Sequence, residues 1–381
     1  MPKLLDLIVK SAEKGLELQA KDGSMPTGHN GPWNDPDTPV RTTAHWAMTF
    51  FRAFEISVES RFCDACVAAC NYLLSKEARP YGCTFYCRKP ESKKAMCNGL
   101  VGQAWAVEPL LVVGRALKHQ PFLNTAEEVL ALHPYSEERH CWSNVEIDGA
   151  VISNDTYNQQ VWFAVMSLLA GEENKKLRRC ALDFFKHLSV TIEFLERGLI
   201  KHHFMSVLSM PRKLGSTIRR QVRFVLAPRA AQCERNSLLE LSNGYLTFLL
   251  YGIAMAEDYY PQSVWSPLGN KQLIRDAVNY IQNRYPFYLL GENRYAWTYN
   301  PVGIEMAYVL QVFGARLELN HTFAATPEMW LTLQFQHYYD ADRGLMDRNT
   351  VDPVVLAARL YEATRIRNYS LMIGGDSANM G

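Results

Sequence analysis

Residues 145–164 read VEIDGAVISNDTYNQQVWFA, and this stretch sets the pattern from which the fold is predicted. Its first half is polar and acidic, with Glu146 and Asp148 beside a glycine, as expected of a loop. Its second half repeats apolar side chains at helical spacing, so a helix is expected to begin at Asp155. No Gly-x-Gly-x-x-Gly motif follows a strand-like run anywhere in the chain, which argues against a dinucleotide-binding fold.

The same alternation of polar loop and helix recurs along the chain. Helices are expected at residues 4–20, 38–57, 60–75, 98–118, 125–132, 155–170, 175–196, 234–257, 271–284, 301–317, 326–338 and 352–364. Helices in such number, with alternating short and long connections, fit six hairpins closed into a ring, an all-α (α/α)6 toroid. We therefore predict one toroid domain over residues 1–370, with an active site among the loops at one end. Residues 371–381 are expected to be a disordered tail.

The composition is that of a globular protein, and its charge gives no reason to expect a nucleic-acid partner. Of the 381 residues, 48% are hydrophobic and 21% charged, and a net charge of +1 gives no general attraction to nucleic acid. No signal peptide or transmembrane run is recognised, and nine cysteines are an odd number for a disulfide framework, so a cytoplasmic location is expected. No metal and no cofactor are expected. Aromatic residues reach 12%, which suits either a large core or a sugar-binding cleft.

The segment 201–229 is rich in histidine and arginine and has two interpretations. The simpler one is a solvated basic connection between two hairpins. The other is a contact surface for an anionic partner, such as an acidic polymer, a phospholipid headgroup or another subunit.

A loop near the N-terminus combines aromatic and hydrogen-bonding side chains. Residues 28–41 read GHNGPWNDPDTPVR, and His45 follows on the next helix. Planar polar groups and rings suit sugar hydroxyls and pyranose faces, and Arg41 or a histidine suits a uronic carboxylate. The alternative is a loop shaped only by its turn-forming residues. The substrate-binding candidates from this region are Trp33, Asn34, Asp35, Arg41 and Trp46.

Two further segments supply candidates for the same cleft. Residues 97–105 read CNGLVGQAW. Gln103 and Trp105 are two positions apart, so their side chains point in different directions from the expected helix. Residues 293–301 read NRYAWTYNP, an aromatic and polar loop before another helix. The candidates from these segments and from the acidic loop are Gln103, Trp105, Glu146, Asp148, Trp297, Tyr299 and Glu305.

Asp155 is the first residue of the motif that most clearly suggests a catalytic role. On pattern alone it is equally well a helix cap or a first-turn acid that the helix dipole stabilises. However, DTYN at residues 155–158, followed by WFA at residues 162–164, resembles the signature of the unsaturated glucuronyl hydrolases. The unsaturated rhamnogalacturonyl hydrolases have a similar segment. Both are (α/α)6 toroids of the six-hairpin glycosidase superfamily.

This resemblance implies a chemical role for Asp155. In those families the matching aspartate protonates the enol ether of an unsaturated uronic acid, and water adds at the adjacent carbon. Carried over, Asp155 is the general acid/base and Asn158 a supporting catalytic residue. The glucuronyl hydrolases also have a second aspartate upstream, where this chain has NGLVGQ at residues 98–103. Glycosidases ordinarily use two carboxylates, and the candidates for the second are Glu146, Asp148, Asp35 and Glu305.

Three functions follow from these observations, all with an oligosaccharide or polysaccharide as partner. The first is a glycoside hydrolase acting on a terminal uronyl or related sugar of an oligosaccharide, unsaturated or saturated. The second is a lyase or sugar epimerase on the same scaffold, with His45, Tyr157 and Arg41 available as base and carboxylate partners. The third is a non-catalytic glycan-binding protein of a polysaccharide pathway, favoured by the missing second carboxylate.

Overall fold

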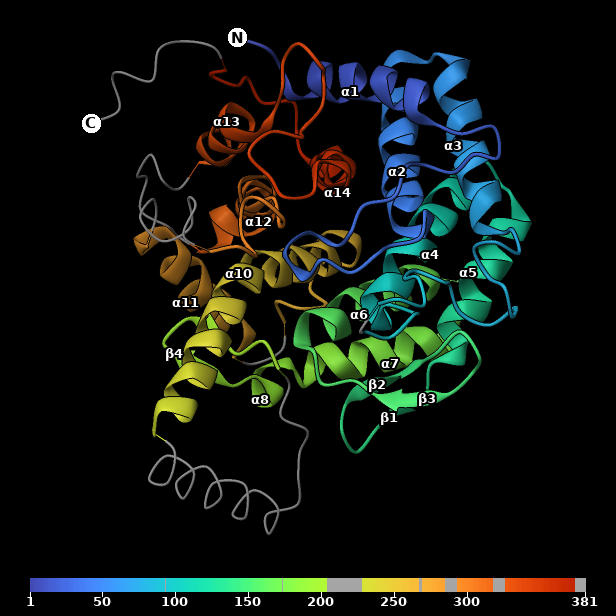
Figure 1. The fold of residues 1–381 in the computed structure, drawn as a ribbon. Coiled ribbons are helices and arrows are strands. Elements are labelled where there is room, and N and C mark those ends of the chain that lie inside the picture. The colour runs from blue at the N-terminus through green and yellow to red at the C-terminus, as the bar shows by residue number, and fades with distance from the viewer. Residues whose placement is uncertain are drawn as a thin grey trace.

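The computed structural model describes residues 1–373 except for residues 93, 173, 204–227, 267–268, 285–292 and 318–325. Helices dominate the described chain, and its strands are short (Figure 1). The prediction of an all-α toroid is confirmed.

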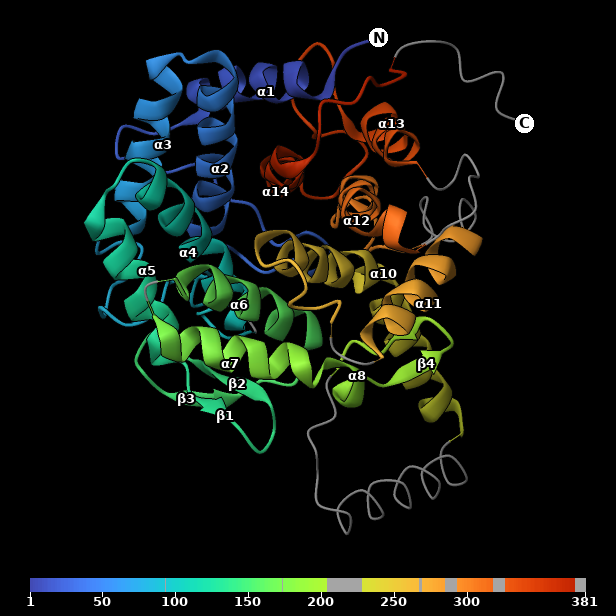
Figure 2. The same ribbon diagram turned by 180° about the vertical axis from the view of Figure 1, so that it is seen from behind.

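The helices form an inner and an outer layer, seen from opposite sides in Figures 1 and 2. The α-helices are α1 (Leu4–Leu18), α2 (Val40–Ser57), α3 (Ser60–Leu73), α4 (Gly99–Ala116), α5 (Gln120–Leu132), α6 (Tyr157–Ala170), α7 (Lys175–Lys186), α8 (Leu188–Thr191), α10 (Pro228–Tyr259), α11 (Asn270–Asn283), α12 (Val302–Leu317), α13 (Pro327–Tyr338) and α14 (Pro353–Ala358). Two 3₁₀ helices are η1 (Gly31–Trp33) and η3 (Arg359–Arg365), and η3 continues α14.

Six helical hairpins close the ring. Inner helices α2, α4, α6, α10 and α12 pack against outer helices α3, α5, α7, α11 and α13, respectively. The sixth pair joins the two ends of the chain, because α1 packs against η3. The inner helices also contact one another in the order α2, α4, α6, α10, α12 and η3, and η3 returns to α2. The chain ends are tied together, since the Leu4 amide donates to the Tyr369 carbonyl and the Leu371 amide to the Pro2 carbonyl.

The two layers differ in sequence because they differ in surroundings. In the inner helix α6 every residue except Gln159 is buried, and its sequence YNQQVWFAVMSLLA is apolar on nearly every face. In the outer helix α7 one apolar stripe faces the ring and lysine and arginine face solvent. The buried residues of α7 are Leu177, Cys180, Ala181, Phe184 and Phe185.

The strands form two small sheets at the periphery. One has the order β1 (Tyr135–Ser136), β2 (Cys141–Val145) and β3 (Val151–Ser153), and the other pairs β4 (Phe194–Glu196) with β5 (Leu199–Ile200). The expected helix over residues 175–196 is therefore interrupted after Lys186: α8 is helical at residues 188–191, but residues 194–196 form β4 and the prediction is wrong there. The chain turns back at Gly198, whose φ of 86° lies in the left-handed region that glycine adopts readily.

The helix starts next to the predicted site differ from the expectation. The N-cap residue of α6 is Thr156, and Asp155 lies outside the helix. Asn98 precedes α4 in a left-handed conformation without capping it, because its Oδ1 accepts a hydrogen bond from Arg88. Asp352 does cap α14, since its Oδ1 accepts from the Val355 amide. The helix-cap interpretation of Asp155 is thus excluded.

Three expectations on segments have partial answers. One stretch of α10, Gln232–Tyr259, is apolar and long enough to cross a membrane by composition, but 78% of its most apolar window is buried, as in a core helix.

Most of the basic segment 201–229 lies outside the described residues. Leu371 is buried, which corrects the expected start of the tail, and residues 374–381 lie outside the described part.

Candidate active site

A cleft of about 370 Å³ opens at the end of the ring where the inner helices begin. Its size is typical of sites for small molecules. The loops before α2, α4, α6 and α12 line it, together with one face of α10 and the pair His202–His203. The lining residues are Asn30, Trp33, Arg88, Lys94, Ala95, Asn98, Gly99, Val101, Trp105, Asn144, Ser153, Asn154, Asp155, Thr156, Asn158, Gln159, His202, His203, Leu241, Tyr245, Phe248, Tyr299, Asn300 and Arg359.

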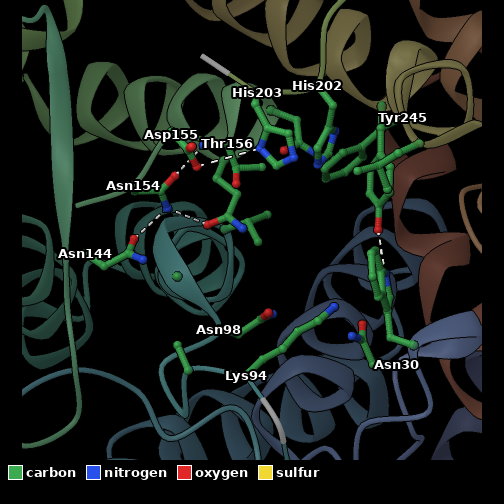
Figure 3. A pocket seen from close by; sticks show the side chains of 18 of the residues that line it. Asn30, Lys94, Asn98, Asn144, Asn154, Asp155, Thr156, His202, His203 and Tyr245 are labelled. Carbon is green, nitrogen blue, oxygen red and sulfur yellow. Dashed lines mark hydrogen bonds and ion pairs between the residues drawn. The ribbon is translucent and has the colours of Figure 1, made fainter. Parts of the chain in front are cut away.

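Asp155, His202 and His203 form a cluster of titratable side chains on one side of the cleft (Figure 3). His203 Nδ1 lies 3.7 Å from Asp155 Oδ1, and this proximity lowers the pKa of Asp155 against the opposing effect of partial burial. Burial, reinforced by His203, lowers the pKa of His202 to about 3. At neutral pH the cleft therefore presents an aspartate anion and a neutral His202.

The chain brings the histidines to Asp155 by backbone pairing. The Tyr157 amide donates to the His202 carbonyl, and Thr156 and His203 form an antiparallel bridge. The His202 amide in turn donates to Ser242 Oγ on α10. The histidine pair is thus held between the start of α6 and the flank of α10.

Side-chain amides hold the β2–β3 hairpin against the start of α6. Asn154 Nδ2 donates to Asn144 Oδ1 at 2.7 Å and to Gln159 Oε1 at 2.8 Å (Figure 3). Buried Gln160 exchanges hydrogen bonds with the Trp142 backbone through both of its amide atoms. Gly99 lets Gln159 approach α4, because a Cβ built on Gly99 would lie only 2.1 Å from Gln159 Oε1.

Lys94 faces the cleft on the side opposite to Asp155 (Figure 3), and Trp33 also lines the cleft. Lys94 Nζ lies 3.1 Å from the centre of the Trp33 ring, whose Nε1 donates to the Tyr245 hydroxyl. Arg88 is neutralised by Asp35 at 2.8 Å, whereas Lys94 lies 3.7 Å from the same carboxylate. Burial and the nearby Arg88 lower the pKa of Lys94 to about 8.

A buried polar layer supports the lining from below. Arg41 donates to Asn30 Oδ1, which also accepts from the Tyr299 hydroxyl at 2.6 Å. The Arg41 guanidinium lies 4.5 Å from the centre of the Trp105 ring. His45 meets the edge of the Trp105 ring, and burial together with nearby arginines keeps its pKa well below the usual range. Arg41 and His45 therefore position lining residues.

Arg359 links the cleft to two buried carboxylates. Its guanidinium donates to Asn300 at 2.7 Å, to Glu305 at 2.9 Å and to Glu362 at 2.7 Å. Burial and mutual repulsion raise the pKa of Glu305 to about 8, while burial raises that of Glu362 to about 6. Burial and mutual repulsion thus make Glu305 the more readily protonated of the two carboxyls.

The structure brings some of the predicted site residues together. Those that line the cleft are Trp33, Trp105, Asp155, Asn158 and Tyr299. Asn158 is buried, and its Oδ1 has no hydrogen-bond partner, so it is available to a ligand.

The other predicted residues do not line the cleft, and each has a local reason. They are Asn34, Asp35, Arg41, His45, Trp46, Gln103, Glu146, Asp148, Trp297 and Glu305. Gln103 is occupied by the Phe85 and Cys97 backbones, and Glu146 accepts from Cys97. Asp148 caps an exposed turn, and Asn34 is exposed at the end of η1. Trp46 and Trp297 are core rings, packed on Phe50 and Trp330, respectively.

The sequence interpretation missed several lining residues. They include Arg88, Lys94, Asn144, Asn154, His202, His203, Tyr245 and Arg359. The adjacent pair His202–His203 was a visible signal, but its distance from Asp155 along the chain hid their contact.

The ring of hairpins with its cleft at one end defines the chain as an (α/α)6 toroid of the six-hairpin type. Solved structures with this fold include cellobiose 2-epimerase from Bacillus thermoamylovorans B4167, with a TM-score of 0.62 and 11% identity over 94% of this chain and 98% of that one. A D-mannose isomerase has a TM-score of 0.61 at 12% identity over 94% of both chains. The α-1,6-mannanase of Salegentibacter sp. HEL1_6 has a TM-score of 0.56 at 10% identity over 95% and 98%.

The sequence itself also has a relative. The chain is 36% identical over 385 residues to archaeal glycosylation protein Q of Haloferax volcanii, and the match covers 98% of this chain and 100% of that protein. The chain belongs to the family of archaeal glycosylation protein Q. No protein-family model matches it.

Proposed function

We propose that the chain is a carbohydrate-active enzyme that transfers a proton at a carbon of an anionic sugar, as an epimerase or isomerase does. The observation that carries the proposal is the contact of ionised Asp155 with His203, next to a neutral His202. The similar folds of a cellobiose epimerase and a mannose isomerase support it, as does the name of the relative, a glycosylation protein.

Asp155 is the only carboxylate among the described residues that line the cleft. A glycosidase with two flanking carboxylates needs one of them protonated as the acid. Here the neighbour of Asp155 lowers its pKa, which favours the charged form. An aspartate beside a histidine instead suits an orienting and charge-stabilising partner of a general base.

In the proposed reaction His203 removes the proton from a sugar carbon next to a carbonyl group. The electron pair of that C–H bond forms the double bond of an enediolate, and Asp155 stabilises the protonated imidazole. In this reaction neutral His202 donates a hydrogen bond to the enediolate oxygen, a role for which a low imidazole pKa is suited. Return of the proton to the neighbouring carbon gives an isomer, and delivery to the opposite face gives an epimer.

Lys94 is the group proposed to recognise a carboxylate on the sugar. Among the lysine and arginine side chains of the lining, Lys94 has the weakest internal ion pair, since Arg88 is paired with Asp35 at 2.8 Å and Arg359 with Glu362, whereas Lys94 lies 3.7 Å from Asp35. The beginnings of α4, α6 and α12 also point their positive dipole ends toward this end of the ring. The Trp33 ring, with Lys94 on one face, adds an apolar surface for the sugar.

A second candidate is the hydrolysis of an unsaturated uronyl residue by Asp155. It is favoured by Asn158, whose unpartnered Oδ1 lines the same cleft as Asp155 in the motif that resembles the glucuronyl hydrolases. Incubation with saturated hexoses and hexuronates and with unsaturated uronyl oligosaccharides, read by mass spectrometry and chromatography, separates the candidates. The main proposal predicts products of unchanged mass, whereas the second predicts cleavage.

A further inference from the structure

Two imidazoles and a carboxylate meet outside the cleft. His140 lies directly before β2, Asp183 lies in the last turn of α7, and His187 ends that helix. One potential ligand atom from each residue lies within 4.8 Å of the other two. No metal site is expected from the sequence, and more than forty residues separate His140 from the other two residues.

The spacing of these groups is close to that of a metal tripod. His140 Nδ1 lies 2.8 Å from Asp183 Oδ2, and His187 Nδ1 lies 3.4 Å from Asp183 Oδ1. A tetrahedral ion with bonds of about 2.0–2.1 Å places neighbouring ligand atoms roughly 3.3 Å apart. The imidazole rings are stacked at 3.6 Å. Binding requires the two rings to turn out of this stacking so that both Nδ1 lone pairs point at one ion, and it replaces the hydrogen bond from His187 Nδ1 to the Asp183 carbonyl.

The surroundings hold the three residues in place. The Tyr135 hydroxyl donates to Asp183 Oδ2 at 2.6 Å, which is the kind of outer partner that orients a ligating carboxylate. His140 has a φ of 50°, in the left-handed region. The three side chains are 22–31% exposed, so an ion and a completing water molecule have access.

We propose that His140, Asp183 and His187 bind a divalent transition-metal ion of the zinc class. Imidazole and carboxylate ligands suit Zn²⁺, and three protein ligands leave one position for water. The ion would fasten the β1–β2 hairpin to the end of α7. Because β2 carries Asn144, which lines the cleft, this clamp would also stiffen one wall of the candidate active site.

The test uses tag-free chain stripped with a chelator and titrated with Co²⁺, followed by visible absorption, and with Zn²⁺, followed by calorimetry. The variants are His187→Ala and His140→Asn, since asparagine tolerates the left-handed backbone at this position. His337→Ala, at an exposed histidine of α13, is the matched control.

We expect one equivalent of metal in the wild type and in His337→Ala, and an affinity at least about tenfold lower in both site variants. Zn²⁺ should raise the melting temperature of the wild type and leave that of His140→Asn unchanged. Absence of binding in the wild type, or equal binding in both folded site variants, would overturn the proposal. The outcome is independent of the sugar chemistry proposed for the cleft.

Discussion

The Nδ1 atom of His203 lies 3.7 Å from Oδ1 of Asp155 in the cleft. The two residues are far apart in sequence, and the pairing of residue 203 with Thr156 brings them together. This contact lowers the pKa of Asp155, which favours the charged carboxylate beside the imidazole.

Substitution of the two residues should separate the candidate reactions. Under the proton-transfer proposal His203→Gln lowers kcat by about a hundredfold to ten-thousandfold. Asp155→Asn lowers it only about fivefold, because an exposed ion pair contributes about 1 kcal/mol. Steady-state kinetics on the sugar identified by the screen give both values, with His337→Gln as control. The reverse order of effects would favour hydrolysis by Asp155.

The affinity for an anionic sugar should depend on the charge of Lys94. Its pKa of about 8 means that the ammonium loses its proton as the pH rises through 8. We expect KM for a carboxylated sugar to rise between pH 7 and pH 9 while kcat changes less. Lys94→Arg should keep KM low over this range, and Lys94→Met should give a high and flat KM. A pH-independent KM in the wild type would argue against Lys94 as the carboxylate-binding group.

Glu305 should make the stability depend on pH. Its folded pKa of about 8 lies above the ordinary value of 4.5, so its contribution is complete at acidic pH and is lost as the pH rises toward 8. A glutamine side chain cannot ionise, so the variant Glu305→Gln should melt with a smaller decrease between pH 5 and pH 8 than the wild type. Thermal melts in a pH series measure this difference.

Glu362→Gln is the contrasting variant for the same network. It removes the carboxylate that neutralises buried Arg359 at neutral pH. Loss of one partner of a buried ion pair costs about 3–5 kcal/mol, whereas Glu305→Gln should cost about 1 kcal/mol because it replaces a neutral hydrogen-bonded group. Equal destabilisation by the two variants would show that both carboxylates are ionised.

Gly99→Ala should destabilise the wall of the cleft. The φ of Gly99 is 61°, which costs an alanine about 1–2 kcal/mol, and the new methyl group would displace Gln159 from Asn154. Gly314→Ala is the control, because this helical glycine has open space around it and alanine should stabilise α12 by up to about 1 kcal/mol. Chemical denaturation measures both changes. Similar effects of the two substitutions would contradict the close approach of α4 and α6.

Much of the fold is predictable because helical spacing is a local property. The apolar runs around Trp105 and after Tyr157 predict helices, and the structure has them. The strands β4 and β5 could not be predicted in this way, because short β segments have little periodicity. Their pairing depends on the turn at Gly198.

The cleft is less predictable than the fold because its geometry is not local. Arg41 and His45 lie on a helix that begins at the cleft, but that helix is buried, so both side chains end below the lining. Lys94 and the two cleft histidines come from segments without a recognisable motif, and the closure of the ring determines their positions.

The most direct test of the proposed chemistry is hydrogen exchange at a sugar carbon. The wild type and His203→Gln are incubated in D₂O with the saturated sugar that binds best, and the recovered sugar is analysed by NMR. The account predicts deuterium at the carbon next to the carbonyl in the wild-type sample, with every glycosidic bond intact, and a rate at least about a hundredfold lower in the variant. Recovery of the sugar without deuterium, or equal exchange rates for both proteins, would contradict proton transfer by His203.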